Sequence, residues 1–505
     1  MGGRSVEYDV VVVGSGAGAL VGAWTAATAG LSTVVLEKAQ LLGGTSAYSG
    51  GGMFLPGNHL TVAAGLPDSI ERGRTYLTSL LGPLDARLEA FLATGPSLVE
   101  ALTRDPLLAL ERTPFPEYYD VPGRLAEGGQ LQPVPLPVAA ADPAVLALVR
   151  PGISADRWAM PMPRDPLWGG QSLITRLLMA LKATGCAEVR TGTTVDELVV
   201  EAGRVVGVVA DTDEGRVTVR ARLGVLLAAG GFERNAELRA KHGVPGEAAH
   251  TQAPAGTNTG EPLEAAMAIG AATDLLGEAW FCPALVEPDG TAGFVLGAHG
   301  GIVVDSAGCR FANESLPYDQ FGREMAKHAT TAWFVFSGRD RGRLPAVRCV
   351  PGPRREDYLA SGAWVQADSL VGLAAVIDAP HLKESVERFN AFAEKGLDED
   401  FHRGEDEFDR YWARGDGPNP CLVPVDEGPF LAAKVVLGDL GTKGGLLTDA
   451  DANVLREDGS AIEGLYAAGN TMAAVTREFY PAPGTPIGTA MVFAHRAVLH
   501  MSQST

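Results

Sequence analysis

Three short apolar runs, far apart in the chain, each lead into a glycine turn. Their continuous apolar character is typical of strands that a parallel sheet buries on both faces. The runs lie at 10–13, 225–229 and 465–468, and the turns follow at Gly14, Gly230 and Gly469. We therefore expect three strands whose turns gather at the carboxyl edge of one sheet, where doubly wound sheets bind ligands.

The remaining pattern alternates between helical and strand-like segments. Helices are predicted over 19–29, within 69–110 and over 172–184, the last with leucines spaced for one buried face. Shorter strands are predicted at 33–36, 188–190, 205–210 and 217–221. Residues 114–166 contain 11 prolines, which oppose helices and central strands. We expect this part to be extended, to wrap the surface and to contribute side chains to a cleft.

The first glycine turn carries a dinucleotide-binding fingerprint. Strand, turn, helix, second strand and an acidic residue follow in order, with Glu37 about 20 residues after the turn. Gly14 makes the tight turn, Gly16 lets the backbone approach a pyrophosphate, and Ala19 takes the small position where the helix packs on the strand. The helix N-terminus favours the phosphate charge. Glu37 can accept hydrogen bonds from ribose hydroxyls.

The other glycine turns favour FAD over NAD. One pyrophosphate site, combined with glycine turns spread over the whole chain, suits a single long cofactor that lies across the sheet. A last helix that opens near Gly488 can direct backbone N–H groups at the flavin pyrimidine oxygen and stabilise a reduced, anionic ring. We therefore predict non-covalently bound FAD.

From about residue 278 the sequence is richer in polar and turn-forming residues, and from about residue 441 it again shows apolar strands and glycine turns. We predict an α/β fold in which a Rossmann-like FAD-binding domain is split in sequence by an inserted α+β catalytic domain. The predicted FAD-binding parts are 1–277 and 441–505, and the predicted insert is 278–440.

Composition narrows the class of protein. The 505 residues are 46% hydrophobic, enough to bury a large core, and the net charge of -20 argues against nucleic acid and anionic membrane surfaces as partners. The cysteines and histidines are scattered without metal-ligand spacing, which favours reduced thiols and no metal site. With no signal peptide and no long apolar run, we predict a cytoplasmic protein without a membrane span. Peripheral contact with a membrane stays open.

Several longer motifs point to one enzyme family. The most specific are Ser49-Gly-Gly-Gly-Met-Phe54, Asn313-Glu-Ser-Leu-Pro-Tyr318-Asp319, Asp439-Leu-Gly-Thr-Lys-Gly-Gly445 and Tyr480-Pro-Ala-Pro-Gly484-Thr-Pro-Ile-Gly488. With the first turn, they resemble the FAD enzymes related to fumarate reductase and, more narrowly, the 3-ketosteroid Δ1-dehydrogenases, nearly from end to end. Lys443 stands where we expect a histidine in the fumarate reductases. Together with the tyrosines, this favours a neutral, apolar substrate over a dicarboxylate.

The resemblance implies which residues contact FAD. Most come from the three glycine turns, the glycine-rich loop 43–52 and the start of the last helix, and four lie elsewhere: Glu37, Lys38, Val195 and Asn235. They are Gly14, Ser15, Gly16, Ala17, Gly18, Ala19, Glu37, Lys38, Gly43, Gly44, Thr45, Ser46, Ser49, Gly50, Val195, Ala228, Ala229, Gly230, Gly231, Asn235, Gly469, Asn470, Ile487 and Gly488.

The resemblance also implies a reaction, the 1,2-desaturation of a 3-ketosteroid. A base takes a proton from C2, a hydride passes from C1 to flavin N5, and donors stabilise the C3 oxygen as it gains charge. By resemblance, Tyr318 is the base and Tyr118 supports it, while the Tyr480 hydroxyl and the Gly484 N–H hold the C3 oxygen. Because Tyr119 is the next residue, the resemblance leaves open whether Tyr118 or Tyr119 supports the base. The electrons then pass to an external acceptor such as a quinone.

One segment departs from the family pattern, and two other functions stay open. Before the last tyrosine, where the family has small, polar residues, this chain has Thr476-Arg477-Glu478-Phe479. The resemblance therefore leaves open which side chains the steroid substrate carries. One alternative is a related flavin desaturase or ene-reductase that acts on another steroid position or another cyclic ketone. The other is a flavin-binding protein without catalysis.

Overall fold

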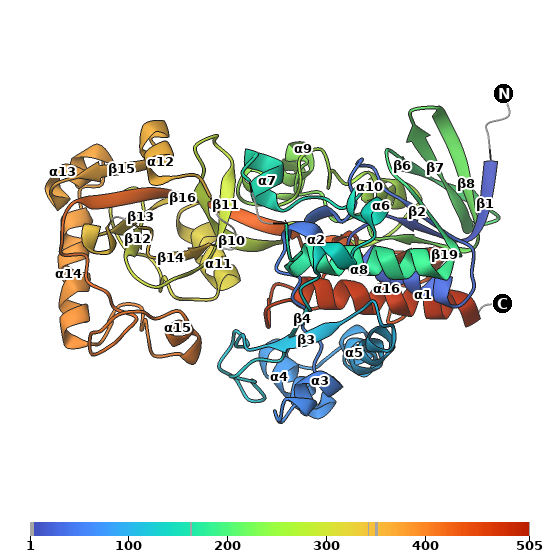
Figure 1. Ribbon diagram of the computed structural model, residues 1–505, viewed down its shortest axis with the longest axis horizontal. Helices are drawn as coiled ribbons and strands as arrows, with labels where there is room; N and C mark the ends of the chain where they lie inside the picture. The colour runs from blue at the N-terminus through green and yellow to red at the C-terminus, as the bar shows by residue number, and fades with distance from the viewer. Residues whose placement is uncertain (1–4, 162–163, 342, 349–351, 504–505) are drawn as a thin grey trace. The chain divides into compact units, whose positions relative to one another are not determined.

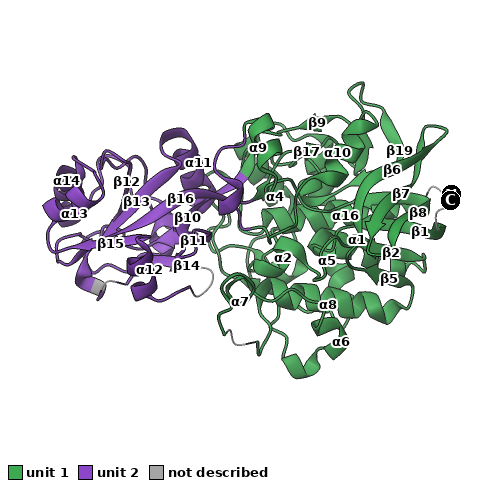
Figure 2. Ribbon diagram, turned by 90° about the horizontal axis from the view of Figure 1, so that it is seen from above, with its two compact units in different colours: residues 1–243, 253–279, 441–505 green, residues 244–252, 280–440 purple. Residues whose placement is uncertain are grey.

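The computed structural model describes residues 5–161, 164–341, 343–348 and 352–503 (Figure 1). Cys349, one of the cysteines expected to be a reduced thiol, lies outside these residues. The chain divides into two compact units, coloured separately in Figure 2. Unit 1 comprises residues 1–243, 253–279 and 441–505, and unit 2 comprises residues 244–252 and 280–440.

The segment Val244–Gln252 groups with unit 2, whereas the sequence analysis assigned it to the FAD-binding part. Two hydrogen bonds explain the grouping. The Thr251 hydroxyl donates to Asp439 Oδ1 at 2.6 Å, and the Gln252 amide donates to the Asp439 carbonyl at 2.8 Å. The roles of the two parts as FAD-binding and catalytic domains stay predictions.

Unit 1 is built on a mainly parallel sheet. Its strands are β18 (Asn453–Leu455), β19 (Ala461–Ala467), β8 (Gly215–Leu227), β1 (Ser5–Val13), β2 (Thr33–Leu36) and β5 (Ala187–Arg190), in this spatial order. From β19 to β5 the neighbours are parallel. Val13 pairs with Leu227, and Leu227 pairs with Ala467. The three glycine turns therefore begin at one edge of the sheet, as predicted.

Strand β8 is longer than the sequence pattern suggested. Two separate strands at 217–221 and 225–229 were predicted, but one strand runs through both as far as Leu227. Gly224 does not interrupt it, because the residue pairs with Val10 of β1; a Cβ there would come within 2.9 Å of Tyr466 Cε2. Before Gly224, β8 also pairs with β7 (Arg204–Thr212), which pairs in turn with the unpredicted strand β6 (Thr194–Glu201).

The helices of unit 1 include a closely packed pair. In α1 (Ala17–Thr28), a Cβ on Gly18 would meet the Ala490 carbonyl at 2.9 Å, so the small residue lets α16 (Thr485–Gln503) approach. The other helices are α2 (Gly44–Tyr48), α3 (His59–Ala63), α4 (Ile70–Leu81), α5 (Ala86–Arg104), α6 (Pro143–Leu146), α7 (Ile153–Trp158), α8 (Gly169–Thr184), α9 (Ala236–His242) and α10 (Glu261–Ala268). The remaining strands are β3 (Leu110–Thr113), β4 (Gln130–Pro133), β9 (Thr273–Asp274) and β17 (Gly445–Leu446).

The proline-rich segment 114–166 is largely irregular, but the expectation that it lacks helices was wrong. It contains α6 and α7. Helix α6 begins with Pro143, and the Asp142 side chain accepts a hydrogen bond from the Ala144 amide at 2.8 Å. Proline is tolerated in a first helical turn because its missing N–H would have no intrahelical partner there.

Unit 2 has an antiparallel sheet with helices against it. The strand order is β12 (Ile302–Val304), β13 (Thr331–Phe336), β16 (Phe430–Thr442), β10 (Ala279–Val286), β11 (Ala292–Ala298) and β14 (Ala346–Arg348), with β15 (Trp364–Ala367) also paired to β16. Its helices are α11 (Tyr318–His328), α12 (Arg355–Ser361), α13 (Leu370–Val376), α14 (Leu382–Lys395) and α15 (Glu407–Tyr411). Val386 and Phe389 of α14 pack into one buried cluster with Ile302 and Val335 of the sheet.

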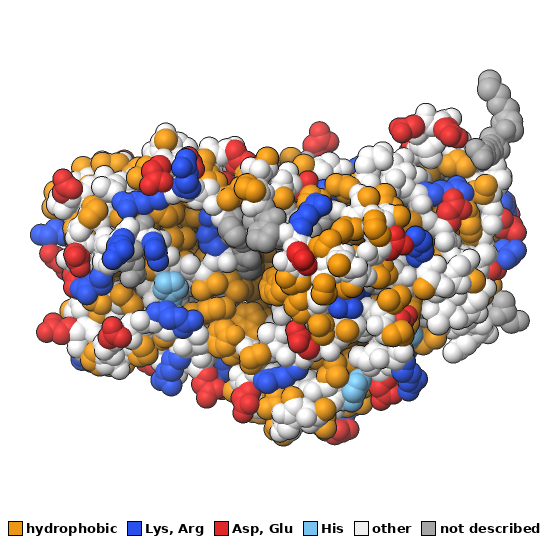
Figure 3. All heavy atoms as spheres, in the orientation of Figure 1, with side chains coloured by type: hydrophobic (Ala, Val, Ile, Leu, Met, Phe, Trp, Pro, Cys, Tyr) orange, Lys and Arg blue, Asp and Glu red, His pale blue; other side chains and the backbone are white. Residues whose placement is uncertain are grey.

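Charged side chains of both signs are interspersed on the face drawn in Figure 3. Lys and Arg there alternate with Asp and Glu and do not form one basic field. Among the described residues, we find no helix with the length and apolar character that a bilayer crossing requires.

Candidate functional site: a flavin cradle and two tyrosine sites

The first glycine turn and the loop 43–46 are fastened to each other. Gly14 has a φ of 103°, and a Cβ on it would lie 2.4 Å from the Ala228 carbonyl oxygen, so only glycine fits this turn. The Gly43 amide donates to Ser15 Oγ at 2.9 Å, and the Ala17 amide donates to Ser46 Oγ at 3.1 Å. These two hydrogen bonds therefore tie the N-terminus of α1 to this loop.

Glu37 ends the second strand beside this turn. Its carboxylate accepts from Ser15 Oγ at 2.5 Å and from the Ala39 amide at 2.8 Å. Burial raises the pKa of Glu37, although both donors favour its charged form. Lys38 Nζ forms an ion pair with Glu261 at 2.5 Å and donates to Thr259 at 2.6 Å.

Side chains join the second and third glycine turns. Thr471 Oγ1 accepts from the Ala229 amide at 3.0 Å and donates to the Gly230 carbonyl at 2.8 Å. The fully buried Glu233 accepts from Asn258 Nδ2 at 2.7 Å and from the Thr442 amide at 3.2 Å. Sequence reasoning missed Glu233, although it follows Gly231 by two residues, and Asn258, which is near Gly230 only in space.

The start of α16 lies directly on the loop 52–54. A Cβ on Gly488 would be 2.4 Å from the Phe54 carbonyl oxygen. Gly484 has a φ of 87°, and a Cβ on it would be 2.4 Å from the Gly52 carbonyl carbon. The Phe54 amide donates to the Gly484 carbonyl at 3.1 Å. The backbone at Gly484 is therefore held in place by direct contact with this loop.

Several other predicted FAD residues have structural partners. Asn235 caps α9 by accepting from the Leu238 amide at 3.0 Å, and it donates to the Thr259 carbonyl at 2.9 Å. Ser49 Oγ donates to the Ser46 carbonyl at 2.8 Å. Val195 is buried in β6, opposite Ala210. The cofactor roles of these residues stay predictions.

The cradle fits a flavin dinucleotide chemically. Among the described residues, the buried hydroxyl oxygen of Thr45 has no hydrogen-bond partner, so this loop offers a polar group to a ligand. A Cβ on Gly16 would make only an ordinary contact, 3.4 Å from Ser46 Oγ, so the need for glycine at this position stays a prediction from the fingerprint. Within the described ranges, no cluster of three or more His, Cys, Asp or Glu side chains could hold a metal ion.

Two of the predicted catalytic tyrosines pack together in unit 1. The ring centroids of Tyr118 and Tyr480 lie 5.4 Å apart, and each residue is 3% exposed. The Tyr118 amide donates to the Pro481 carbonyl at 3.0 Å. Tyr119 instead packs edge-on against Phe479 at 5.9 Å. Of the two adjacent tyrosines, Tyr118 is therefore the one beside Tyr480.

The segment that departs from the family pattern forms a tight turn before Tyr480. The Phe479 amide donates to the Thr476 carbonyl at 3.1 Å, and Arg477 takes a left-handed φ of 54°. The side chains of Arg477 and Glu478 are exposed. The fully buried Lys443 donates from Nζ to the Glu478 carbonyl at 2.6 Å and to the Phe479 carbonyl at 3.3 Å. The lysine therefore fastens the turn from inside.

A buried ion pair anchors the segment before Tyr118. Arg72 Nη1 donates to the two carboxylate oxygens of Glu117 at 2.7 and 2.9 Å, and Arg72 Nη2 donates to Asp68 at 2.7 Å. The Leu125 amide also donates to Glu117 at 2.8 Å. Burial raises the pKa of Glu117 to about 7, because the loss of water outweighs the attraction of Arg72.

The raised pKa of Glu117 predicts a pH-dependent stability. The folded protein holds this proton more tightly than the unfolded chain, so the stabilisation is complete below the ordinary pKa of 4.5 and is lost as the pH rises through about 7. As the pH rises over this range, we expect the free energy of unfolding of the FAD-loaded protein to fall by about 3 kcal/mol relative to that of a Glu117→Gln variant. Melting midpoints at several pH values measure the loss. Glu71→Gln, on the exposed side of α4, is the control. A midpoint difference that is constant with pH would contradict the prediction.

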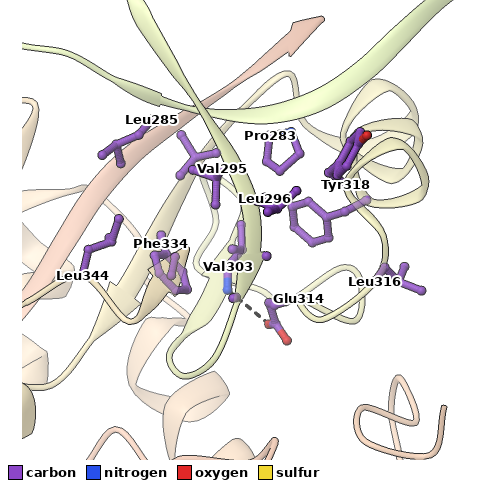
Figure 4. Close-up of a pocket in the computed structure, with 15 residues that line it drawn as sticks. Pro283, Leu285, Val295, Leu296, Val303, Glu314, Leu316, Tyr318, Phe334 and Leu344 are labelled. Carbon is purple, nitrogen blue, oxygen red and sulfur yellow. Dashed lines mark hydrogen bonds between the residues drawn. The ribbon is translucent and has the colours of Figure 1, made fainter. Parts of the chain in front are cut away.

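Tyr318 lies in unit 2, at the first position of α11, and is 5% exposed. Its ring packs edge-on against Phe294 at 4.8 Å. The residue lines a cavity of about 30 Å³ whose walls are mostly apolar. Figure 4 shows Tyr318 on one side of this cavity and Leu344 on the opposite side. The surroundings of Tyr318 therefore suit an apolar ligand better than a charged one.

A buried ion-pair network holds the loop that precedes Tyr318. Glu314 accepts from Arg310 Nη2 at 2.8 Å, from Arg403 Nη1 at 3.1 Å and from the Val303 amide at 3.1 Å, the last drawn in Figure 4. Although burial opposes its ionisation, the two guanidinium charges keep the pKa of Glu314 below its usual value. Arg403 also donates to Ser315 Oγ at 2.9 Å. These bonds therefore hold the loop that precedes Tyr318 in place.

Comparison with known proteins identifies the class. A family described as an FAD-binding domain matches residues 9–487. A 3-oxosteroid 1-dehydrogenase of Mycobacterium tuberculosis is 38% identical over 98% of both chains. The crystal structure of 3-ketosteroid Δ1-dehydrogenase from Sterolibacterium denitrificans, in complex with 1,4-androstadiene-3,17-dione, superposes with a TM-score of 0.90 and 34% identity over 99% of this chain and 100% of the other. A 4-oxocyclohexanecarboxylate 2-dehydrogenase of Sinomonas cyclohexanicum is 34% identical over 97% of this chain and 92% of its own.

The fold and the flavin cradle thus define an FAD-dependent oxidoreductase, which confirms the predicted cofactor and class of enzyme. The chain belongs to the family that contains the 3-oxosteroid 1-dehydrogenases.

Proposed function

We propose that this chain catalyses the FAD-dependent 1,2-desaturation of 3-ketosteroids. One observation carries the proposal. The buried pair of Tyr118 and Tyr480 lies near Gly484, which packs against the loop 52–54, in a chain 38% identical along nearly its whole length to a 3-oxosteroid 1-dehydrogenase. A neutral ketone suits this site, because phenol and amide donors can hold a ketone oxygen without a counter-ion.

The unit 1 tyrosines bind and polarise the ketone in this proposal. Tyr480 Oη and the Gly484 N–H donate to the C3 oxygen, whose negative charge grows as the C2 proton leaves. Donors fixed in advance stabilise such charge best, because they need no reorganisation during the reaction. Pro481 and Pro483 restrict the loop, and the bond between Phe54 and Gly484 holds its end.

Tyr318 takes the C2 proton in this proposal. An ordinary tyrosine has a pKa of about 10 and is a weak base at neutral pH, so its phenolate needs help. The position of Tyr318 at the start of α11 stabilises the phenolate in part, since the N-terminus of a helix favours negative charge. Tyr118, also assigned by family resemblance, assists the proton transfer. FAD, when bound, supplies the hydride acceptor.

A flavin reduction assay tests the proposal. We expect androst-4-ene-3,17-dione to bleach the visible flavin absorption of the anaerobic protein, and we expect a product lighter by two hydrogens. Mass spectrometry checks the product. If no 3-ketosteroid bleaches the flavin but a ketone that is not a steroid does, steroid desaturation is refuted. A flavin that no ketone reduces would support a binding protein without catalysis.

A second candidate is desaturation of a smaller cyclic ketone. The 34% identity to a 4-oxocyclohexanecarboxylate 2-dehydrogenase favours keeping it. The same assay with 4-oxocyclohexanecarboxylate decides between the two. Faster bleaching by this acid than by the steroid would favour the second candidate.

We further propose that FAD is held non-covalently and that a quinone or another diffusible acceptor reoxidises it. Acid precipitation should release all of the yellow flavin into the supernatant, and flavin retained in the pellet would refute non-covalent binding. Reoxidation of the bleached protein by a soluble quinone, followed by absorbance, tests the acceptor.

A further inference from the structure

Tyr76 joins the two segments that carry the tyrosine pair of unit 1. It lies on α4 and is fully buried. Its hydroxyl donates to the Pro481 carbonyl at 2.6 Å and accepts from the Tyr119 amide at 3.2 Å. The same Pro481 carbonyl accepts from the Tyr118 amide at 3.0 Å. One phenol oxygen therefore bridges the residue after Tyr118 and the residue after Tyr480.

Helix α4 holds the Tyr118 segment at two points on one face. Arg72 and Tyr76 are four residues apart, so their side chains project from the same side of the helix. Arg72 binds Glu117 and Tyr76 binds Tyr119, so Tyr118 lies between two anchored neighbours. Gly123 then lies against the helix, where a Cβ would be 2.5 Å from the Tyr76 amide nitrogen. The segment has little freedom to shift along α4.

The Tyr76 hydroxyl keeps its proton. Burial, and after it the negative charge of Glu117, raises the pKa of Tyr76 well above the ordinary value. The neutral phenol is therefore a permanent donor to Pro481.

We propose that Tyr76 is a positioning residue that sets the spacing between Tyr118 and Tyr480. It does so through Pro481 and Tyr119 and does not touch the substrate. This inference rests on the proposed function. Removal of its hydroxyl takes away the bonds to Pro481 and Tyr119, so the spacing between the two segments relaxes while the ring still fills its place. Because the donors act mainly on charge that develops during the reaction, the loss falls on kcat more than on KM.

The test compares Tyr76→Phe with Tyr466→Phe in the full FAD-loaded chain. Tyr466 is also buried in unit 1, and its hydroxyl hydrogen-bonds to His500 Nδ1 at 2.9 Å, so the control removes the same group from a different place. We expect Tyr76→Phe to lower kcat by about tenfold to a hundredfold with the steroid KM within about twofold. Tyr466→Phe should retain the wild-type kcat. FAD content and melting midpoint should be alike in the two variants.

Three results would overturn the positioning role. The first is a kcat equal to that of Tyr466→Phe, and the second is a loss that appears wholly in KM. The third is failure of Tyr76→Phe to fold or to hold FAD when Tyr466→Phe does both, because the hydroxyl would then serve the fold as a whole. A wild-type protein that no 3-ketosteroid reduces would instead overturn the proposed function itself.

Discussion

Replacing Tyr318 by phenylalanine should nearly abolish desaturation and leave a yellow, FAD-loaded protein. The phenol oxygen is the proposed acceptor of the C2 proton, and a positioned base contributes about 10²- to 10⁴-fold to such a step. The ring should keep its place, because it packs against Phe294 and the loop before it is held by Glu314. Steady-state kcat with a dye acceptor and single-turnover flavin bleaching both measure the effect.

A second tyrosine of unit 2 provides the control for Tyr318→Phe. Tyr358 is buried, hydrogen-bonds to Glu287 and Arg348, and is not one of the residues that line the Tyr318 cavity. Tyr358→Phe should retain turnover. If Tyr318→Phe turns over the steroid at the wild-type rate, Tyr318 is not the base.

Replacing Tyr480 by phenylalanine should lower kcat by about 10²- to 10³-fold, the loss expected for one donor to a developing oxyanion. Contact with Tyr118 should keep the new ring in position, so the loss comes from the missing hydrogen bond. The FAD content should not change, since the three glycine turns form the cradle without the hydroxyl. Steady-state kinetics with the steroid and a dye acceptor measure the loss.

Tyr466→Phe, which removes a buried hydroxyl elsewhere in unit 1, is again the matched control. An unchanged kcat for Tyr480→Phe would exclude its hydroxyl as a donor to the C3 oxygen. A rise in KM with kcat unchanged would limit Tyr480 to binding the ground state.

Much of unit 1 could be predicted from sequence because its signals are local. The apolar run before Gly14 and the glycines after it are adjacent in the chain, and a strand followed by a glycine turn and a helix needs no distant partner to be recognised. Helix α8 was predicted because its leucines repeat at helical spacing within one segment. Local patterns failed at Gly224, where pairing with distant strands carries β8 through a residue that weakens strands.

The candidate site was harder to predict, since its geometry depends on distant contacts. The family motifs predicted roles for Tyr480 and Tyr318, but nothing near them in the sequence indicated Tyr76. The bonds of Tyr76 to Pro481 and Tyr119 span 405 and 43 residues. Lys443 likewise looked like a substitution in a ligand-binding motif, and in the structure its amine fastens the turn before Tyr480.

The sequence by itself determined the class of cofactor, the split of the parallel-sheet unit and the family. These three properties depend on residue types at fixed spacing, and both the types and the spacing can be read from the sequence without a structure. Only the tertiary structure decided that Tyr118, and not Tyr119, lies against Tyr480, and that α4 holds both segments. Adjacent side chains in an extended segment point in different directions, and only packing against the rest of the chain selects which of them faces a given partner.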